Sequence, residues 1–348
     1  MKPSADKKKL KIAIVGCGRI SQTHIKAIMK NQNSFEIRAV CDPKQERTKQ
    51  TSEKFKIPSY SSLDALLDNE ELDIVTLCSP SGLHSEQARK IAQRKIHVIT
   101  EKPMATRWKD GLAMVKECDA NNVKLFVVKQ NRHNKTLLEL KKAIESGSFG
   151  KIYLVHINVF WTRPQSYYDE AKWRGTWEFD GGALMNQASH YVDLLEWLIG
   201  PVEKVHCITS TTRQIEVEDT AVMNLKWRNG ALGSLAVTML TYPKNLEGSI
   251  TIIGENGTAK IGGVAVNEIQ EWVFKSNVNK DLVADASYNP ESVYGFGHTA
   301  YYENVANCIL RGAEAETDGR EGLKSLELLV AAYLSARDDR TISLPLEF

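Results

Sequence analysis

No apolar run in this chain approaches the roughly 18 residues that a membrane-spanning helix requires, so the sequence indicates no membrane span. An excess of one charge is also missing: among 348 residues, 45 Lys and Arg face 43 Asp and Glu, a net charge of +2. A balanced charge gives no basic field that would attract nucleic acid or a membrane surface. The basic segment 1–9 precedes an apolar run of only strand length, so we expect no signal peptide and a cytoplasmic protein.

Cysteine pairs are absent as well. No two of the six cysteines stand in a C-x-x-C pair, and three of them lie at or beside the end of an apolar run: Cys17, Cys41 and Cys78. This spacing argues against a disulfide framework and is typical of buried free thiols in a reducing compartment. The chain also lacks internal repeats and low-complexity stretches, and its length predicts about two domains.

What the chain does have is a glycine-rich turn directly after an apolar run. Residues 11–15 have the pattern of a buried strand, and Gly16-Cys17-Gly18 follows at once. Gly16 permits a tight turn, Gly18 lets backbone approach a phosphate because it has no Cβ, and Ser21 is small enough for close helix–strand packing. A glycine turn alone would also fit a plain strand–helix connection.

The helix expected after this turn supplies further candidate contacts. Its first free N–H groups belong to Arg19 and Ile20, and a helix N-terminus binds anions such as a pyrophosphate. A second apolar run, 35–41, ends at Asp42, about 20 residues farther on, where a carboxylate typically binds the ribose of a dinucleotide. The combined pattern therefore predicts an NAD site, with a preference for NAD over NADP.

The first 130 residues alternate strands with helices, with strands predicted at 11–15, 35–41, 73–78, 96–100 and 124–128. This alternation predicts a Rossmann domain over residues 1–130, with a doubly wound parallel sheet. Ligands bind at the carboxyl ends of the strands in such sheets. The polar residues that we place there, near the cofactor, are Asp42, Ser79, His84, Glu101 and Gln130.

From residue 131 to 348 the pattern changes to an α+β domain. A helix at 135–146 and a strand at 151–161 lead to an aromatic loop, and later strands are predicted at 202–211, 219–227, 231–240, 248–253 and 258–261. Arg228-Asn229-Gly230 is typical of a hairpin turn. Helices at 297–311 and 319–337 close the chain. We expect a large, mostly antiparallel open sheet whose free face favours a homo-oligomer.

Lys102 is the first candidate for chemistry. It follows the predicted strand at 96–100 in the motif Glu101-Lys102-Pro103, where its ammonium could hydrogen-bond a substrate hydroxyl. The alternative is a surface lysine before a turn.

His190 is the second candidate. A helix predicted from Gly181 to Ile199 places Asn186, His190 and Asp193 on one face. A histidine beside a carboxylate can hold one tautomer and move protons near neutral pH, although a lone helical histidine is often structural. Asn186 is a poor metal ligand and no further His or Glu accompanies it, so we predict no metal.

Together these motifs resemble the glucose–fructose oxidoreductase/inositol dehydrogenase/rhizopine catabolism (Gfo/Idh/MocA) family over essentially the whole chain. The resemblance rests on Gly16-x-Gly18-x-x-Ser21, Ser79-Pro80…His84, Glu101-Lys102-Pro103 and Gly181-Gly182…Asn186…His190…Asp193. It implies an NAD-dependent dehydrogenase, a tetramer among its relatives, in which Lys102 contacts the reacting hydroxyl and His190 is the acid/base. Most members have aspartate where this chain has Asn186.

Within that family, residues 159–168, 173–177 and 181–190 are similar to the bacterial UDP-N-acetyl-2-amino-2-deoxy-glucuronate 3-dehydrogenases of lipopolysaccharide O-antigen biosynthesis. Asparagine at position 186 is usual in that subgroup. The resemblance implies oxidation of the 3-hydroxyl of UDP-N-acetyl-glucuronic acid (UDP-GlcNAcA). An anionic sugar nucleotide needs cationic partners, and Arg163 and Arg174 are candidates because guanidinium pairs with carboxylate or phosphate.

The predicted site therefore has two parts. We expect substrate contacts from Lys102, Arg163, Tyr168, Asn186 and His190, and cofactor contacts from Gly16, Gly18, Arg19, Ile20, Asp42, Ser79, His84, Glu101, Lys102, Gln130, Trp173 and Arg174. Two other functions stay open: a dehydrogenase of a free sugar or inositol, and a regulator that binds NAD without turnover. Lys102 and His190 argue against the regulator, because a pure binder needs neither.

Overall fold

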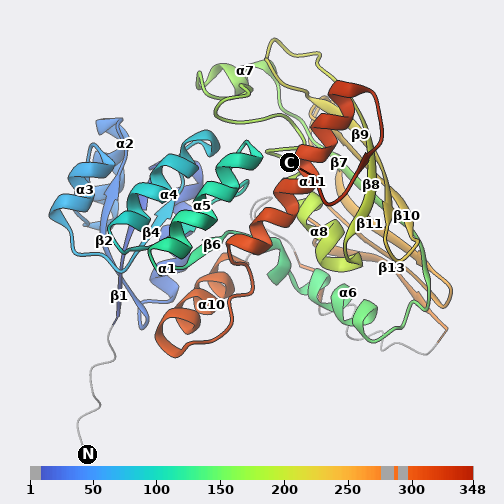
Figure 1. Ribbon diagram of the computed structural model, residues 1–348, viewed down its shortest axis with the longest axis horizontal. Coiled ribbons are helices and arrows are strands. Elements are labelled where there is room, and N and C mark those ends of the chain that lie inside the picture. The colour runs from blue at the N-terminus through green and yellow to red at the C-terminus, as the bar shows by residue number, and fades with distance from the viewer. Residues whose placement is uncertain (1–8, 276–285, 289–296, 348) are drawn as a thin grey trace, which may run out of the picture. The chain divides into compact units, whose positions relative to one another are not determined.

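The computed structural model describes residues 9–275, 286–288 and 297–347 (Figure 1). Most of the basic N-terminal segment, on which the expectation of no signal peptide rests, lies outside these residues. The chain divides into two compact units. The first contains Met1–Val128 and His298–Leu323, and the second contains Lys129–Gly297 and Lys324–Phe348.

The first unit is built on a six-stranded sheet in the order β3-β2-β1-β4-β5-β6, with every neighbouring pair parallel. The strands are β1 (Leu10–Val15), β2 (Phe35–Cys41), β3 (Ser59–Tyr60), β4 (Ile74–Leu77), β5 (His97–Thr100) and β6 (Leu125–Val127). This confirms the predicted Rossmann sheet. Strand β3 was not predicted, because two residues are too short to show an alternating pattern.

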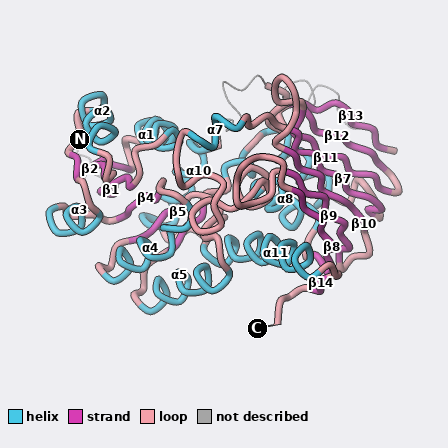
Figure 2. Tube along the Cα trace, turned by 90° about the horizontal axis from the view of Figure 1, so that it is seen from above, coloured by secondary structure: helices cyan, strands magenta, loops and turns pink. Residues whose placement is uncertain are grey.

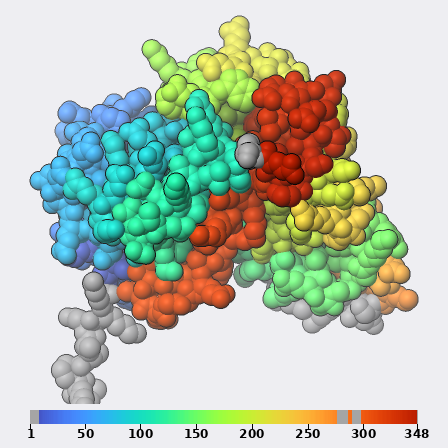
Figure 3. Space-filling view, viewed as in Figure 1, coloured from blue at the N-terminus to red at the C-terminus, as the bar shows by residue number. Residues whose placement is uncertain are grey.

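The connecting helices are α1 (Arg19–Lys30), α2 (Gln45–Phe55), α3 (Leu63–Asn69), α4 (His84–Gln93) and α5 (Trp108–Ala120). Figure 3 shows the side chains of α4 and α5 covering the side of this unit that faces the viewer.

One helix of the first unit comes from far along the chain. Helix α10 (His298–Arg311) packs Tyr301, Tyr302 and Val305 into the same apolar core as Ile12 of β1 and Ile25 of α1. Residues 298–323 lie within the predicted second domain, 131–348, whereas in the structure they complete the first unit. The reason is tertiary: the buried face of α10 is matched by β1 and α1, which its local pattern cannot show.

The second unit is built on an eight-stranded sheet in the order β13-β12-β11-β7-β10-β9-β8-β14. Its strands are β7 (Ile152–Phe160), β8 (Val202–Ser210), β9 (Thr220–Trp227), β10 (Leu232–Thr238), β11 (Glu247–Gly254), β12 (Gly257–Gly262), β13 (Glu268–Phe274) and β14 (Ile342–Ser343). All neighbouring pairs are antiparallel except β7 and β10. The mostly antiparallel open sheet and the β9–β10 hairpin are confirmed.

The helical segments of this unit are η2 (Gln130–His133), α6 (Lys135–Glu145), α7 (Gln165–Asp169), α8 (Ser189–Ile199) and most of α11 (Gly319–Asp338). Figure 2 shows helices α8 and α11 on one side of the sheet, while the other side carries none of the labelled helices. Among the described helices, none is both long and apolar enough to cross a bilayer.

Candidate functional site

The glycine turn of the first unit lies where β1 and β4 end side by side. Gly16 has φ +96°, and a Cβ there would lie 2.6 Å from the backbone C and O of Cys78. No other residue fits without moving the end of β4. Gly18 precedes α1, and a Cβ there would meet nothing within 4 Å. The turn is therefore closed toward the sheet at Gly16 and open at Gly18, which suits the approach of a phosphate.

Two polar side chains hold this turn. Ser21 Oγ donates to the carbonyl of Gly18 at 2.7 Å. Asp42, at the end of β2, accepts hydrogen bonds from the backbone N–H of Cys17 at 2.8 Å and of Lys44 at 2.8 Å. The structure thus brings the glycine turn and Asp42 together, as predicted. Arg19 is exposed and Ile20 half-buried at the start of α1. Their cofactor contacts stay predictions.

The loops after β4 and β5 are joined by His84. Its Nε2 lies 2.9 Å from the carbonyl of Ser79 and its Nδ1 lies 3.1 Å from the carbonyl of Pro103. His84 has no exposed surface. Burial lowers its pKa, although hydrogen bonds to these carbonyls oppose the effect. His84 therefore acts on the site by tying Ser79 to the segment that carries Lys102.

Glu101, which precedes Lys102, is the centre of a buried hydrogen-bonded chain. Its Oε1 lies 2.8 Å from His24 Nε2, and its Oε2 accepts from the backbone N–H of Lys102 at 2.9 Å. His24 Nδ1 in turn lies 2.8 Å from the hydroxyl of Tyr302. Burial would raise the pKa of Glu101, but the hydrogen bond from His24 and the nearby ring of His298, whose Nε2 lies 3.9 Å away, hold that pKa well below its usual value.

His24, Glu101 and His298 also place three possible metal-ligating atoms within 4.8 Å of one another. Both ring nitrogens of His24 are already engaged, with Tyr302 and with Glu101. We therefore interpret the cluster as support for the backbone of Lys102 rather than as a metal site.

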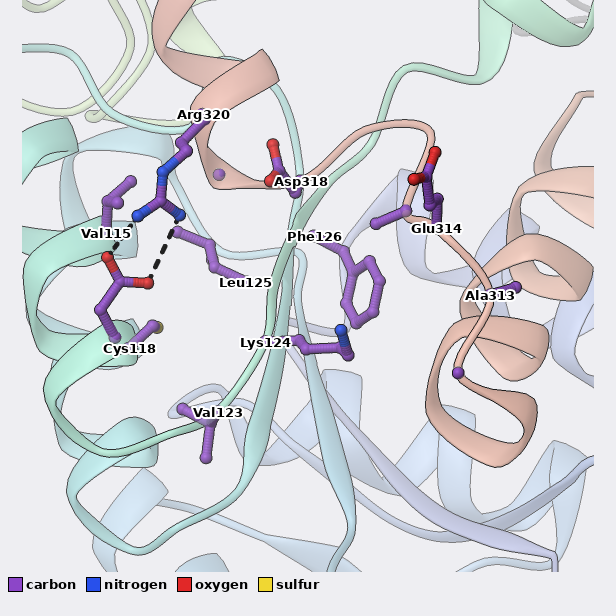
Figure 4. Close-up of a pocket in the computed structure, with 14 residues that line it drawn as sticks. Val115, Cys118, Val123, Lys124, Leu125, Phe126, Ala313, Glu314, Asp318 and Arg320 are labelled. Atoms are coloured by element: carbon purple, nitrogen blue, oxygen red, sulfur yellow. Dashed lines mark hydrogen bonds and ion pairs between the residues drawn. The ribbon is translucent and has the colours of Figure 1, made fainter.

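The first unit also has a cavity of about 540 Å³ at its other edge (Figure 4). It is lined by the C-terminal part of α5, the start of β6 and residues 312–320, and the ion pair between Arg320 and Asp119 spans one side at 2.7 Å. Since the strands are parallel, the amino end of β6 lies at the edge opposite Gly16. Ligands of such sheets bind at the carboxyl edge, so this cavity is not the predicted dinucleotide site.

In the second unit, His190 is the second residue of α8 and is buried. Its Nε2 lies 3.0 Å from Nε2 of Gln130, which belongs to η2 and is also buried. Gln130, predicted as a cofactor contact, therefore meets the predicted acid/base in the structure. Its amide can fix which ring nitrogen of His190 carries the proton.

Asp193 does not serve His190 as expected. Its carboxylate forms a bidentate pair with Arg132, at 2.7 and 2.8 Å, and lies 3.1 Å from Lys129 Nζ. Burial would raise the pKa of Asp193, but the two cations lower it to about 2. Because both of its charged partners lie in or next to η2, Asp193 holds η2 against α8. Sequence reasoning missed Arg132 and Lys129, although both lie within two residues of the predicted contact Gln130, just after the strand predicted at 124–128.

Asn186 lies in a turn and not on a helix, which corrects the shared helical face predicted with His190. Helix α8 begins only at Ser189. The Asn186 side chain donates to Asp180 Oδ1 at 2.5 Å, and Asp180 Oδ2 accepts from the backbone N–H of Gly175 at 2.7 Å. A carboxylate is therefore present beside position 186, supplied by Asp180. Asp180 thus connects the Asn186 turn with the aromatic loop.

Both arginines of the aromatic loop lie close to the ring of Tyr167. The guanidinium carbon of Arg163 lies 5.4 Å from the ring centre of Tyr167, and that of Arg174 lies 4.2 Å from it. Arg174 also pairs with Glu170 at 2.5 Å and lies 5.6 Å from the ring centre of Trp173. The positive charge of Arg174 is therefore partly compensated by Glu170 within the loop.

Arg163 makes different contacts. It donates to the carbonyl of Thr162 at 2.7 Å, and no described carboxylate forms an ion pair with it. Tyr168 is buried at 6% exposure, and burial raises its pKa. Of the two arginines, Arg163 is thus the better candidate for an anionic ligand.

Two family models match this chain. The model of the oxidoreductase family's NAD-binding Rossmann fold matches residues 10–129, and the model of its C-terminal α/β domain matches residues 141–344. Curated relatives are similar over nearly the full length. D-apiose dehydrogenase of Paraburkholderia graminis is 27% identical, with 97% of this chain and 90% of that protein covered. Myo-inositol 2-dehydrogenase of Thermotoga maritima is 27% identical, covering 96% and 98%.

Two crystal structures are more similar. The WlbA dehydrogenase from Bordetella pertussis, in complex with NADH and UDP-GlcNAcA, is 56% identical with a TM-score of 0.95, covering 99% of this chain and 100% of that chain. The WlbA dehydrogenase from Chromobacterium violaceum, in complex with the same two ligands, is also 56% identical. Its TM-score is 0.93, and the match covers 100% of this chain and 99% of that chain.

Proposed function

This chain belongs to the Gfo/Idh/MocA family of NAD-binding oxidoreductases, and we propose that it oxidises the 3-hydroxyl of UDP-GlcNAcA to a 3-keto sugar nucleotide. One observation carries the choice of substrate. Two dehydrogenases that are 56% identical over essentially the whole chain were crystallised with NADH and UDP-GlcNAcA. The family relationship alone would leave many sugars and inositols open.

We assign the dinucleotide to the first unit, within the predicted domain 1–130, and the sugar nucleotide to the second, within 131–348. The open turn at Gly18, the carboxylate of Asp42 and the N-terminus of α1 fit a dinucleotide. Residues 298–323 belong to the first unit in the structure, but none of the predicted cofactor or substrate contacts lies among them.

The reaction removes a proton and a hydride from one carbon–oxygen unit of the sugar. His190 accepts the proton of the 3-hydroxyl as the C–O bond becomes a carbonyl. Lys102 donates a hydrogen bond to the same oxygen and orients it. NAD, when bound, supplies the acceptor for the hydride that leaves sugar carbon 3. Gln130 holds the ring of His190, and Glu101 holds the backbone of Lys102.

Arg163 is our candidate for the negative charge of the substrate. Its guanidinium is half-buried over the rings of Trp161 and Tyr167, which hold its orientation. A guanidinium held in this way can pair with a carboxylate through two parallel hydrogen bonds. We place Tyr168 beside it as a lesser substrate contact, and we keep Trp173 and Arg174 as proposed contacts of the cofactor.

The biological setting is also part of the proposal. The resemblance to the O-antigen subgroup supports a role in the biosynthesis of lipopolysaccharide sugars, carried out in the cytoplasm by a homotetramer. The open face of the second sheet supplies a surface for such an assembly.

Production of NADH, followed by its absorbance, tests the substrate. We expect reduction of NAD with UDP-GlcNAcA and little or none with UDP-N-acetylglucosamine, because a neutral sugar would leave a cation placed for a carboxylate unpaired. Myo-inositol and glucose serve as the test of the alternative that the D-apiose and inositol dehydrogenase relatives favour. Equal kcat/KM for inositol and UDP-GlcNAcA would refute the proposed substrate. Binding of NAD without turnover of any sugar would favour the regulator.

A further inference from the structure

The turn that precedes α8 directs four successive backbone N–H groups to the same two residues, Glu218 and Tyr333. Gly182 and Met185 donate to the hydroxyl of Tyr333 at 3.3 and 3.2 Å. Leu184 donates to Glu218 Oε1 at 2.8 Å. The backbone N–H of Ala183 donates to the carbonyl of Glu218 at 2.9 Å.

Glu218 and Tyr333 are also joined to each other. The Tyr333 hydroxyl donates to Glu218 Oε1 at 2.9 Å, so one carboxylate oxygen accepts from both the turn and the tyrosine. Glu218 is buried at 3% exposure. A Cβ on Gly182 would collide with the Glu218 carboxylate, and this collision explains why a glycine stands at that position.

These contacts fix the turn that stands where a helix was predicted from Gly181. The N–H of Asn186 donates to the carbonyl of Gly182, four residues back, but the N–H of Ala188 donates to the carbonyl of Ala183, five residues back, so the regular helical ladder starts only with α8 at Ser189. Glu218 precedes β9 and Tyr333 belongs to α11, so the turn is held between two elements that are distant in sequence.

The turn is linked to the predicted catalytic helix by backbone hydrogen bonds. The N–H of Ala188 donates to the carbonyl of Ala183 at 2.8 Å, and the N–H of Val192 donates to the carbonyl of Ala188 at 2.9 Å. His190 lies between Ala188 and Val192 in the sequence, so this hydrogen bond closes the helical turn that carries it. A shift of the turn would therefore move the first turn of α8, and Asn186 with it.

We propose that Glu218 and Tyr333 form a clamp that positions His190 and Asn186 for proton transfer. This inference rests on the function proposed above and adds two positioning residues to it. Neither residue contacts a reacting atom, and both act through the backbone of residues 182–185.

The substitution Tyr333→Phe tests the clamp because it deletes one oxygen and keeps the ring, which stacks edge-on against Trp177 at 5.3 Å. Glu218→Gln is the conservative partner variant, since its carbonyl oxygen can still accept from Leu184. The matched controls are Tyr301→Phe, a buried tyrosine of the first unit, and Glu196→Gln, a half-buried glutamate of α8 that does not bond the turn.

Amide hydrogen exchange of residues 182–188 and steady-state kinetics are measured on all four full-length variants. In Tyr333→Phe we expect faster exchange in this segment and a fall in kcat of roughly 10- to 100-fold, because small misplacements of a catalytic group have effects of this size. The KM for NAD stays unchanged, and the deuterium isotope effect with substrate labelled at sugar carbon 3 increases. Glu218→Gln keeps kcat within a few fold of wild type, and both controls behave as wild type.

Two outcomes overturn the clamp. One is unchanged exchange at 182–188 in Tyr333→Phe. The other is a wild-type kcat and isotope effect in that variant despite faster exchange. If the wild-type protein fails to reduce NAD with UDP-GlcNAcA, the proposed function fails instead. The exchange measurement needs no substrate and still decides whether the turn is clamped.

Discussion

Asp42 shows how one residue can serve both the fold and a ligand. Its two carboxylate oxygens accept from the backbone N–H groups of Cys17 and Lys44, and so they hold the glycine turn against the end of β2. Each carboxylate oxygen can accept more than one hydrogen bond. The proposed ribose contact therefore adds to an existing network rather than replacing it.

For Asp42→Ala we expect the kcat/KM for NAD to fall about 10- to 100-fold, because hydrogen bonds to a charged group contribute roughly 1.5–3 kcal/mol each. The kcat/KM for NADP should fall less or rise, since the 2′-phosphate no longer meets a like charge. Steady-state kinetics with both dinucleotides measures the ratio. A wild-type protein that used NADP as well as NAD would refute the role of Asp42.

Lys102 and His190 belong to the same scale. We expect Lys102→Ala and His190→Asn each to lower kcat by about 10²- to 10⁴-fold, since loss of positioned acid–base help has effects of this size. NAD affinity and a cooperative thermal transition should be kept. Near-wild-type turnover in either variant would show that the residue has no part in proton transfer. Loss of the folded state in His190→Asn would favour a structural histidine.

At the scale of elements, helix α8 carries one carboxylate that is paired with cations, Asp193, and a second, Glu196, for which no ion pair is formed among the described residues. Asp193 is tied to Arg132 and Lys129. Among the described residues, Glu196 in the next turn of the helix accepts only from the backbone N–H of Val202, at 3.5 Å. Burial raises the pKa of Glu196 to about 7, with a smaller contribution from Glu327. The two acids therefore affect stability in opposite ways as pH changes.

For Glu196 the folded state holds a proton that the unfolded state releases above pH 4.5. Its contribution to stability is therefore greatest at low pH and is lost as pH rises from about 4.5 to 7, by at most about 3 kcal/mol. Urea unfolding at pH 5 and pH 8 should show a smaller loss in Glu196→Gln than in wild type. The exposed Glu53→Gln is the control. Parallel pH dependence in Glu196→Gln and wild type would contradict the assignment.

The helices and strands were predicted better than the long-range contacts between their side chains. The strands of the first sheet follow from apolar runs bounded by turns, so all but the two-residue β3 were predicted. The start of α8 was wrong because Ala183, Leu184 and Met185 favour a helix locally, while contacts with Glu218 and Tyr333, which are distant in sequence, hold them in a turn. Asp193 was given the wrong partner for a similar reason: Arg132 lies 61 positions away, and no local spacing reveals it.

At the scale of the whole molecule, a row of exposed apolar residues crosses the second sheet. Leu232, Leu154 and Ile253 lie opposite one another on β10, β7 and β11, and Val273 of β13 continues the row beyond Thr258 of β12. The four apolar residues are between 38% and 62% exposed. An exposed apolar surface of this kind marks an interaction site, and a second copy of the chain is the partner expected from the proposed tetramer.

We expect sedimentation of the wild-type protein as a tetramer and of Leu232→Glu as a smaller species, because a charge in an apolar interface loses its hydration without gaining a partner. Met29→Glu, at an exposed position of α1 in the first unit, is the control and should sediment as wild type. A monomeric wild type, or a Leu232→Glu protein of unchanged size, would exclude this face as the interface.

The return of residues 298–323 to the first unit has a consequence for synthesis. The core around β1 and α1 needs Tyr301, Tyr302 and Cys308, which the ribosome adds only after nearly the whole second unit. At about 5–20 residues per second, the first unit waits roughly 10 to 35 s with that side of its core open. The unit that is begun first is therefore completed late, and a gene fragment that ends at residue 130 would encode six strands without the helix that closes them.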